Sequence, residues 1–400
     1  MCEQCMNNSF KLLRREFLYS AGAAAAGMAW RAGSAMGAAG AGPAVGGKKK
    51  PAVVHMKFFY PSTESLRQAG YYSWPGSGFD AEGRQREYAA KIAEIGKQLK
   101  MNVVVDDRAI CEQDDITHFI KQVQEEKPDG LLLVAFKKSE WSAIVRVVKE
   151  TGVPTVAVAT LGVLLQGNIN QLYREPGVYT ISSLDNFDAM AYGLRMIRTA
   201  SWLRQARILS IIGDQERQDC EPHFGTAIRV VPTQAIIEMF ESIPRDEHVR
   251  QIAQDYVSQA SERRESTDED ILDAARAEVA LQRLLEREQA DVLMMECLGP
   301  LSTGRFVAPC MGFMTLRDAG IVAGCQNDLD STMTMMLMQQ LFDRPGFQQN
   351  PAFDSEKDTY FAAHCTSPRK MHGLDGPAEP YILRNHAEAG CGVVPQVLFP

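Results

Sequence analysis

The chain lacks the features that mark several large classes of protein. Its 400 residues include 42 Lys and Arg against 50 Asp and Glu, and the longest basic run, residues 48–50, has three members. Such a chain offers no extended basic surface for nucleic acid or for an anionic membrane. It also contains no Gly-rich phosphate loop, no G-x-S-x-G elbow and no H-E-x-x-H helix. P-loop, serine hydrolase and zincin chemistry are therefore disfavoured.

Long hydrophobic runs and paired cysteines are absent too. The Ala-rich run near the N-terminus is too short and too weakly apolar to span a bilayer, so we expect no stable membrane span. Of nine cysteines, Cys2 and Cys5 fall in the predicted leader described next. The seven cysteines that remain are odd in number and are not closely spaced in pairs, which favours buried free thiols over a disulfide framework. These seven are Cys111, Cys220, Cys297, Cys310, Cys325, Cys365 and Cys391.

The N-terminal residues have the layout of a secretory signal. Residues 11–31 place Arg14 and Arg15 before a mildly apolar, Ala-rich run. The segment Arg14-Arg15-Glu16-Phe17-Leu18 resembles the twin-arginine export signal, although Leu13 stands where that signal usually has Ser or Thr. We therefore expect residues 1–50 to be signal peptide and linker. The resemblance implies an exported protein that works in the periplasm or another extracytoplasmic space.

From residue 51 onward, short apolar strands alternate with amphipathic helices. This alternation predicts an α/β fold of doubly wound parallel sheets, flavodoxin-like or Rossmann-like, covered on both faces. The first domain is predicted at 51–175, with strands at 52–60, 101–105, 130–136 and 154–159 and helices at 82–100, 114–126 and 141–150.

The same alternation then starts again and predicts a second α/β domain at 176–350. Its expected helices are 184–204, 270–288 and 331–342, and its expected strands are 208–212, 292–295 and 321–324. Thr267 followed by Asp270 is typical of a helix start. Residues 351–400 are expected to begin a β-rich C-terminal domain that is truncated here.

Polar residues that follow strands are the first candidates for a site, because ligands of open parallel sheets bind at the carboxyl ends of strands. Glu296 follows one predicted strand, Asp328 follows another, and His364 follows a later apolar stretch. One Glu, one Asp and one His near strand ends form a candidate divalent-cation site, although their spacing is unspecific.

Residues 291–368 resemble the L-fucose isomerase and L-arabinose isomerase-like family. The matching text is Pro309-Cys310, AGIVAGCQNDLDSTMTMMLMQQL, RPGFQQNPAFD and Ala363-His364-Cys365, in that order. The family has two N-terminal α/β domains and interconverts aldoses and ketoses on a divalent metal, commonly manganese. The resemblance thus implies a monosaccharide as the small-molecule partner, manganese as cofactor and a homo-oligomer.

Two positions depart from the family pattern. The glutamate of the family's Cys-Glu-x-Asp segment falls on Gln326, and the aspartate of its Phe-x-x-Asp segment falls on Asn350. An amide keeps the shape of the carboxylate but cannot act as a base, and it removes a negative charge that would face a dication. No catalytic residue is therefore assigned with certainty.

Three functional hypotheses follow. The first is a degenerate isomerase-family protein that binds a sugar through Gln326, Asn327, Asp328 and Asn350, with Trp74 available for stacking. The second is an active isomerase in which an extended 326–328 segment lets Asp328 replace the missing carboxylate, joined by Glu296 and His364 as metal ligands. The alternative to both is an extracytoplasmic two-lobed sugar-binding protein without catalysis.

Overall fold

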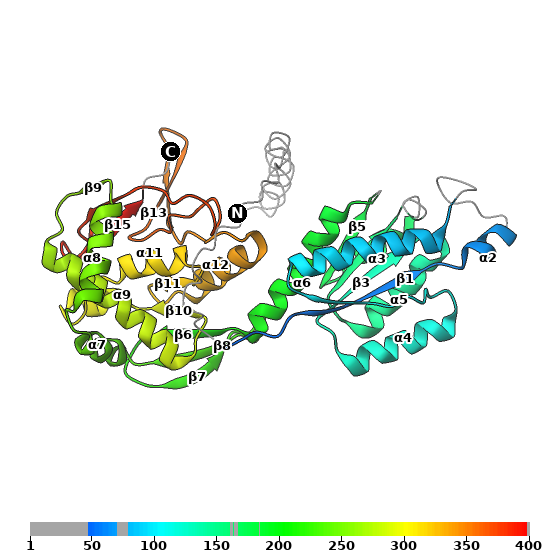
Figure 1. The fold of residues 1–400 in the computed structure, drawn as a ribbon, viewed down its shortest axis with the longest axis horizontal. Helices are drawn as coiled ribbons and strands as arrows, with labels where there is room; N and C mark the ends of the chain where they lie inside the picture. Colours follow the sequence, from blue (N-terminus) through cyan, green and yellow to red (C-terminus); the bar gives the residue numbers. More distant parts are fainter. Residues whose placement is uncertain (1–46, 70–78, 161–162, 164–166, 184, 398–400) are drawn as a thin grey trace, which may run out of the picture. The chain divides into compact units, whose positions relative to one another are not determined.

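A five-stranded parallel sheet follows the N-terminal segment (Figure 1). The computed structural model describes residues 47–69, 79–160, 163, 167–183 and 185–397. The predicted leader and Trp74 lie outside this range. The sheet has the order β2-β1-β3-β4-β5, which is a doubly wound order. Its strands are β1 (Val53–Phe59), β2 (Asn102–Val105), β3 (Gly130–Ala135), β4 (Thr155–Ala159) and β5 (Val178–Ser182).

Helices cover both faces of this first sheet. Tyr88 and Leu194 belong to one buried cluster, and Phe119 and Val147 belong to another. The near-continuous burial of β3 and β4 is what such double covering requires. The helices are α2 (Thr63–Gln68), α3 (Ala81–Gln98), α4 (Gln113–Glu126), α5 (Trp141–Thr151) and α6 (Phe187–Gln205), with short 3-10 turns at η1 (Lys138–Glu140) and η2 (Gly167–Leu172).

A second five-stranded sheet has the order β11-β10-β6-β8-β7, in which β7 runs antiparallel to β8. Its strands are β6 (Arg207–Ile211), β7 (Arg217–Cys220), β8 (Ala227–Val231), β10 (Val292–Met295) and β11 (Ala323–Cys325). The associated helices are α7 (Thr233–Ser242), α8 (Glu247–Gln259), α9 (Asp268–Glu288), α10 (Leu298–Ser302), α11 (Cys310–Asp318) and α12 (Leu329–Phe342). The short strand β11 forms one edge of the sheet, and this edge positions the site described below.

The remaining strands confirm a β-rich C-terminal portion. β12 (Asn350–Asp354) and β13 (Thr359–Ala363) form an antiparallel hairpin, on which Phe353 and Phe361 are 79% and 63% exposed. β14 (Tyr381–Arg384) pairs with β15 (Val394–Val397) and with β9 (Glu262–Arg263), so the chain's end joins the segment before α9.

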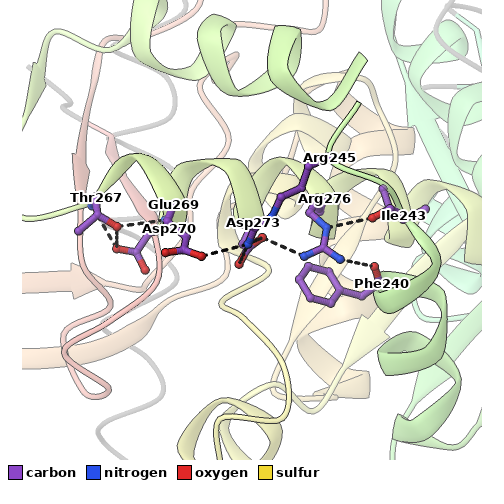
Figure 2. Close-up of polar contacts among 8 residues, drawn as sticks. All are labelled: Phe240, Ile243, Arg245, Thr267, Glu269, Asp270, Asp273 and Arg276. Carbon is purple, nitrogen blue, oxygen red and sulfur yellow. Dashed lines mark hydrogen bonds and ion pairs between the residues drawn. The ribbon is translucent and has the colours of Figure 1, made fainter. Parts of the chain in front are cut away.

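The long helix α9 is held at its start and along its side by polar contacts (Figure 2). Thr267 and Asp270 form a reciprocal capping box, as the sequence predicts. Nearly two turns further on, the Arg276 guanidinium donates to the backbone oxygens of Phe240 and Ile243, each at 3.1 Å. Arg276 thereby donates to carbonyls at the C-terminal end of α7, where the helix provides few partners; the Phe240 oxygen also accepts from the Ile243 N–H. It also packs over the Phe240 ring.

The fold class is confirmed: the chain is α/β with parallel sheets and a β-rich C-terminal portion. The predicted strands at 130–136 and 292–295 and the helix at 270–288 agree closely with β3, β10 and α9. One difference concerns the first sheet, which continues past residue 175 because β5 pairs with β4. Among the described residues, no helix is long and apolar enough to cross a membrane.

A buried carboxylate in α9 makes stability depend on pH. Burial raises the pKa of Glu278, whose side chain accepts hydrogen bonds from Tyr256 and Gln282. The native state therefore holds its proton at pH values where the unfolded chain has released it, so stability falls as pH rises above the ordinary glutamate range. We expect Glu278→Gln to flatten this decline, measured as the difference between the free energies of unfolding in urea at pH 5 and at pH 8. The exposed Glu286→Gln on the same helix is the control, and equal pH slopes in all three proteins would contradict the assignment.

Candidate functional site

A pocket of about 980 Å³ lies at the carboxyl end of β10 and β11. Its walls come from the segments that follow β10, β11, β13 and β14, together with the β12–β13 hairpin and β15. Open parallel sheets bind ligands at this edge because the strand ends leave a crevice there. The volume falls at the upper end of the range of small-molecule sites.

At its outer edge, the backbone of β11 forms hydrogen bonds with side chains and not with another strand. The Gln348 side chain accepts from the Cys325 N–H at 2.8 Å and donates to the Cys325 oxygen at 3.1 Å. The Arg317 guanidinium donates to the Ala323 oxygen and, at 3.1 Å, to the Thr366 oxygen. Because these contacts bind the 347–350 and 364–366 segments to the end of β11, residues distant in sequence meet at the pocket.

Gln348 should therefore stabilise the site. We expect Gln348→Leu to lower the free energy of unfolding by about 2 kcal/mol, since two buried hydrogen bonds of about 1 kcal/mol each are lost. Chemical denaturation measures this difference. The neighbouring Gln349→Leu, whose side chain contacts the Tyr360 hydroxyl in an exposed position, should change stability by less than about 0.5 kcal/mol. Equal losses in the two variants would contradict the role of Gln348.

Directly after β11 the backbone turns sharply. Gln326 and Asn327 both have left-handed conformations, with φ of 56° and 51°. Asn327 is held by its N–H, which donates to the Met295 oxygen, and by its Oδ1, which accepts from the Ser210 hydroxyl at 2.8 Å. The expectation of an extended 326–328 segment is thus wrong, because two successive left-handed residues turn the chain into α12. Such strain is costly and concentrates at functional sites.

The structure brings some of the predicted site residues together and separates others. Gln326, Asn350 and His364 all line the pocket. Asp328 instead caps α12, where its carboxylate accepts from the N–H and hydroxyl of Ser331. The Glu296 carboxylate accepts from the N–H of Gly299 at the start of α10. Asn327 serves the turn described above, and Trp74 lies outside the described residues.

The pocket does not offer the donor set that manganese prefers. Among the described residues, two groups of three or more candidate ligand atoms lie within 4.8 Å of one another, and neither contains a carboxylate. Manganese favours carboxylate and carbonyl oxygen. Glu296 and Asp328, the predicted oxygen ligands, are not gathered with His364 in either group. The residues present therefore do not fit this ion.

The pocket contains one ion pair and two imidazoles. Arg384 is the one Lys or Arg among the described lining residues, and it makes two hydrogen bonds to the Glu265 carboxylate, at 2.6 and 3.2 Å. This contact lowers the pKa of Glu265 to about 2. Burial lowers the pKa of His364 and of His386, with the Arg317 charge adding to the effect at His364. Both imidazoles are therefore neutral near pH 7. Apart from the Glu265–Arg384 pair and the exposed Glu388 carboxylate, the pocket presents uncharged groups.

Sequence reasoning missed the sulfur-rich floor of the pocket. Four thiols and two imidazoles meet there, and together we name them the thiol cluster: Cys297, Cys310, Cys325, Cys365, His364 and His386. The Cys297 contact lowers the pKa of Cys325, but the Cys365 contact and burial outweigh it and raise that pKa to about 12. Apart from the adjacent His364 and Cys365, successive members lie 13 to 39 positions apart along the chain, so their spacing gives no motif. Two pocket-lining aromatic residues, Phe347 and Phe361, were missed as well.

Comparison with curated proteins finds a distant likeness to a sugar isomerase. The chain is 17% identical over 316 residues to sulfoquinovose isomerase of Priestia aryabhattai, and equally to that of Priestia megaterium. Each match covers 70% of this chain and 70% of the relative. No family model matches the chain. The resemblance to sugar isomerases is thereby supported at a distance, and the finer family assignment stays a prediction.

Solved structures of sugar-binding proteins match with low scores. A sugar-binding protein of a sugar ABC transporter from Bacillus halodurans has a TM-score of 0.20 at 12% identity, covering 81% of this chain and 99% of that one. GanP, a glucose-galactose binding protein from Geobacillus stearothermophilus, has a TM-score of 0.21 at 12% identity, covering 69% and 95%. Scores this low support no inference about the chain.

Proposed function

We propose that the chain is a sugar-binding protein of the sugar isomerase type, which holds a monosaccharide in the pocket without isomerising it. The observation that carries the proposal is that Gln326 and Asn350, 24 positions apart in the sequence, both line one pocket. Each amide both donates and accepts hydrogen bonds, as does a sugar hydroxyl. Phe347 and Phe361 add aromatic surface against which the apolar face of a sugar ring could pack.

The proposed ligand is a neutral sugar. The curated relatives are named for an isomerase of sulfoquinovose, a sugar with a sulfonate group. A cationic group forms the strongest hydrogen bonds to a sulfonate. The Arg384 guanidinium in this pocket is already engaged by Glu265 and, at 3.4 Å, by Gln396. An anion would have to break this ion pair, whereas hydroxyl groups can use the amides directly.

The proposal excludes turnover because the two carboxylates that the family uses for isomerisation are replaced by amides. Moving a proton between two sugar carbons needs a base near the substrate and stabilisation of the enediolate. The two family carboxylates are amides here, and the His364 Nδ1 lies 3.3 Å from the Cys365 thiol. The pocket can therefore bind hydroxyl groups, and neither of the two family positions supplies a base. Among the described lining residues the carboxylates are Glu265, which is paired with Arg384, and the exposed Glu388.

Calorimetric titration with neutral aldoses and ketoses and with sulfoquinovose tests the proposal, alongside an aldose–ketose assay with and without manganese. We expect binding of a neutral monosaccharide, weaker binding of sulfoquinovose and no turnover. Absence of binding by every sugar would overturn the binding role. Turnover with manganese would restore the active isomerase, and tighter binding of sulfoquinovose would overturn the preference for neutral sugars.

We also propose that the protein is exported, on the strength of the Arg14-Arg15 pair in the predicted leader. Replacing both arginines by lysine blocks a twin-arginine route while keeping the charge. Cell fractionation should find the parent protein outside the cytoplasm and the double variant inside. Equal distribution of both proteins would contradict this route.

A further inference from the structure

Two thiols and one imidazole that line the pocket lie at the spacing of metal ligands. The ligand atoms of Cys325, His364 and Cys365 are all within 4.8 Å of one another. The sulfur atoms of Cys325 and Cys365 are 3.9 Å apart, and the His364 Nδ1 lies 3.3 Å from the Cys365 sulfur. A tetrahedral zinc ion, with bonds of about 2.3 Å to sulfur and 2.0 Å to nitrogen, places two sulfurs about 3.8 Å apart and a sulfur and a nitrogen about 3.5 Å apart. The two observed separations are close to these values.

A second group of candidate ligands, Cys310, Cys365 and His386, shares Cys365 with the first. Cys310 is absent from the described residues that line the pocket, whereas Cys325, His364 and Cys365 all line it. An ion can therefore reach the first group from the pocket, and a further ligand can approach the ion from the same side.

The elements around the first group hold its ligands in place. Cys325 ends β11, where the Gln348 side chain binds its backbone N–H and oxygen. Cys365 precedes Thr366, whose oxygen accepts from the buried Arg317 guanidinium. Support of this kind is what a metal site needs, because the ligands must converge without large rearrangement.

The charges around the group also suit a dication. Burial lowers the pKa of His364, so the imidazole is in the neutral form that binds metals. The Arg317 guanidinium interacts electrostatically with Cys325 and Cys365, and a positive charge favours the thiolate form of both. A bound cation deprotonates coordinating thiols outright. Two thiolates and Zn²⁺ then carry no net charge, which limits the cost of burying the ion.

We propose that Cys325, His364 and Cys365 bind one zinc ion whose fourth position is open to the pocket. Thiolate and imidazole ligands select a soft or borderline cation such as Zn²⁺ over manganese. Three protein ligands leave the fourth tetrahedral position to water or to a small molecule in the pocket. Cys297 is outside the ligand set: its sulfur lies 3.5 Å from that of Cys325, where its thiol can donate to the coordinated sulfur and orient it.

The test measures zinc binding and the open position in the full chain. Protein that is reduced, stripped of metal and titrated with Zn²⁺ should bind one ion. Co²⁺ in its place should show the intense sulfur-to-cobalt absorption of a thiolate site. Added azide should then shift the cobalt spectrum, because azide enters the open fourth position.

Variants identify the ligands. We expect Cys325→Ser and Cys365→Ser to weaken zinc binding by more than about 100-fold, because loss of an outer-shell partner alone costs about 10–100-fold. Cys297→Ser keeps a hydrogen-bond donor beside Cys325 and should bind zinc within about tenfold of the parent. The exposed Cys220→Ser is the matched control and should bind zinc as the parent does.

Several results would overturn the proposal. In the parent protein, substoichiometric zinc, cobalt without the thiolate band, or a cobalt spectrum that azide leaves unchanged would refute an open site, even if a variant fails to fold. Unchanged zinc affinity in folded Cys325→Ser, or an equal loss in Cys297→Ser, would refute the ligand set. Loss of zinc in Cys310→Ser with retention in Cys325→Ser would assign the ion to the second group. None of these results depends on whether the pocket binds a sugar.

Discussion

Replacing Arg317 by leucine is expected to lower the free energy of unfolding by about 3–5 kcal/mol. The substitution leaves the buried oxygens of Ala323 and Thr366 without their donor, at about 1–3 kcal/mol each, and it leaves space in a packed interior. The substitution also removes a buried charge, and this offsets part of the loss in stability. Burial lowers the pKa of Arg317, so it disfavours the charged form. Urea unfolding measures the net effect.

Two further variants separate the role of Arg317 from a general effect of losing an arginine. Arg317→Lys keeps the charge but cannot fork to both oxygens, so its stability should fall between the parent and the leucine variant. The exposed Arg305→Leu, whose guanidinium contacts Gln234, should change stability by less than about 0.5 kcal/mol. If Arg317→Leu unfolds at the same urea concentration as Arg305→Leu, the edge of β11 does not depend on this side chain.

The second large effect concerns sugar affinity. We expect Gln326→Ala combined with Asn350→Ala to weaken binding of the preferred neutral sugar by about 10- to 100-fold, since each amide contributes hydrogen bonds of about 1 kcal/mol. Both side chains are exposed in the pocket, so the fold should persist. Isothermal titration measures the dissociation constant.

The matched control is Asn102→Ala, which removes an exposed amide from β2 in the first sheet. It should leave the dissociation constant within about twofold of the parent value. Undiminished affinity in the double variant would show that the sugar binds elsewhere, even if binding itself is real.

Much of the fold follows from patterns that depend on burial. The runs at β3 and β10 consist of apolar residues that are buried throughout, and such runs are visible in sequence. β7 and β9 were missed because their residues are exposed and polar, so no apolar pattern marks them. β5 was missed because its residues are mostly half-buried at the sheet edge, where the pattern is weak.

The site was predictable only in part. Gln326 and Asn350 were found through a resemblance, and the structure places both in the pocket. The position of Asp328 depends on the left-handed backbone conformations of Gln326 and Asn327. Non-glycine residues rarely adopt this conformation, and no local sequence pattern predicts it here. The thiol cluster depends on the tertiary contacts of Arg317 and Gln348, which join segments dozens of residues apart.

A crystal structure of the protein with its tightest-binding monosaccharide would test directly whether this pocket is the sugar site. We expect a sugar ring in the pocket, with hydroxyl groups within hydrogen-bond distance of the Gln326 and Asn350 amides. A sugar bound only at the first sheet, with both amides facing solvent, would show that this pocket is not the sugar site.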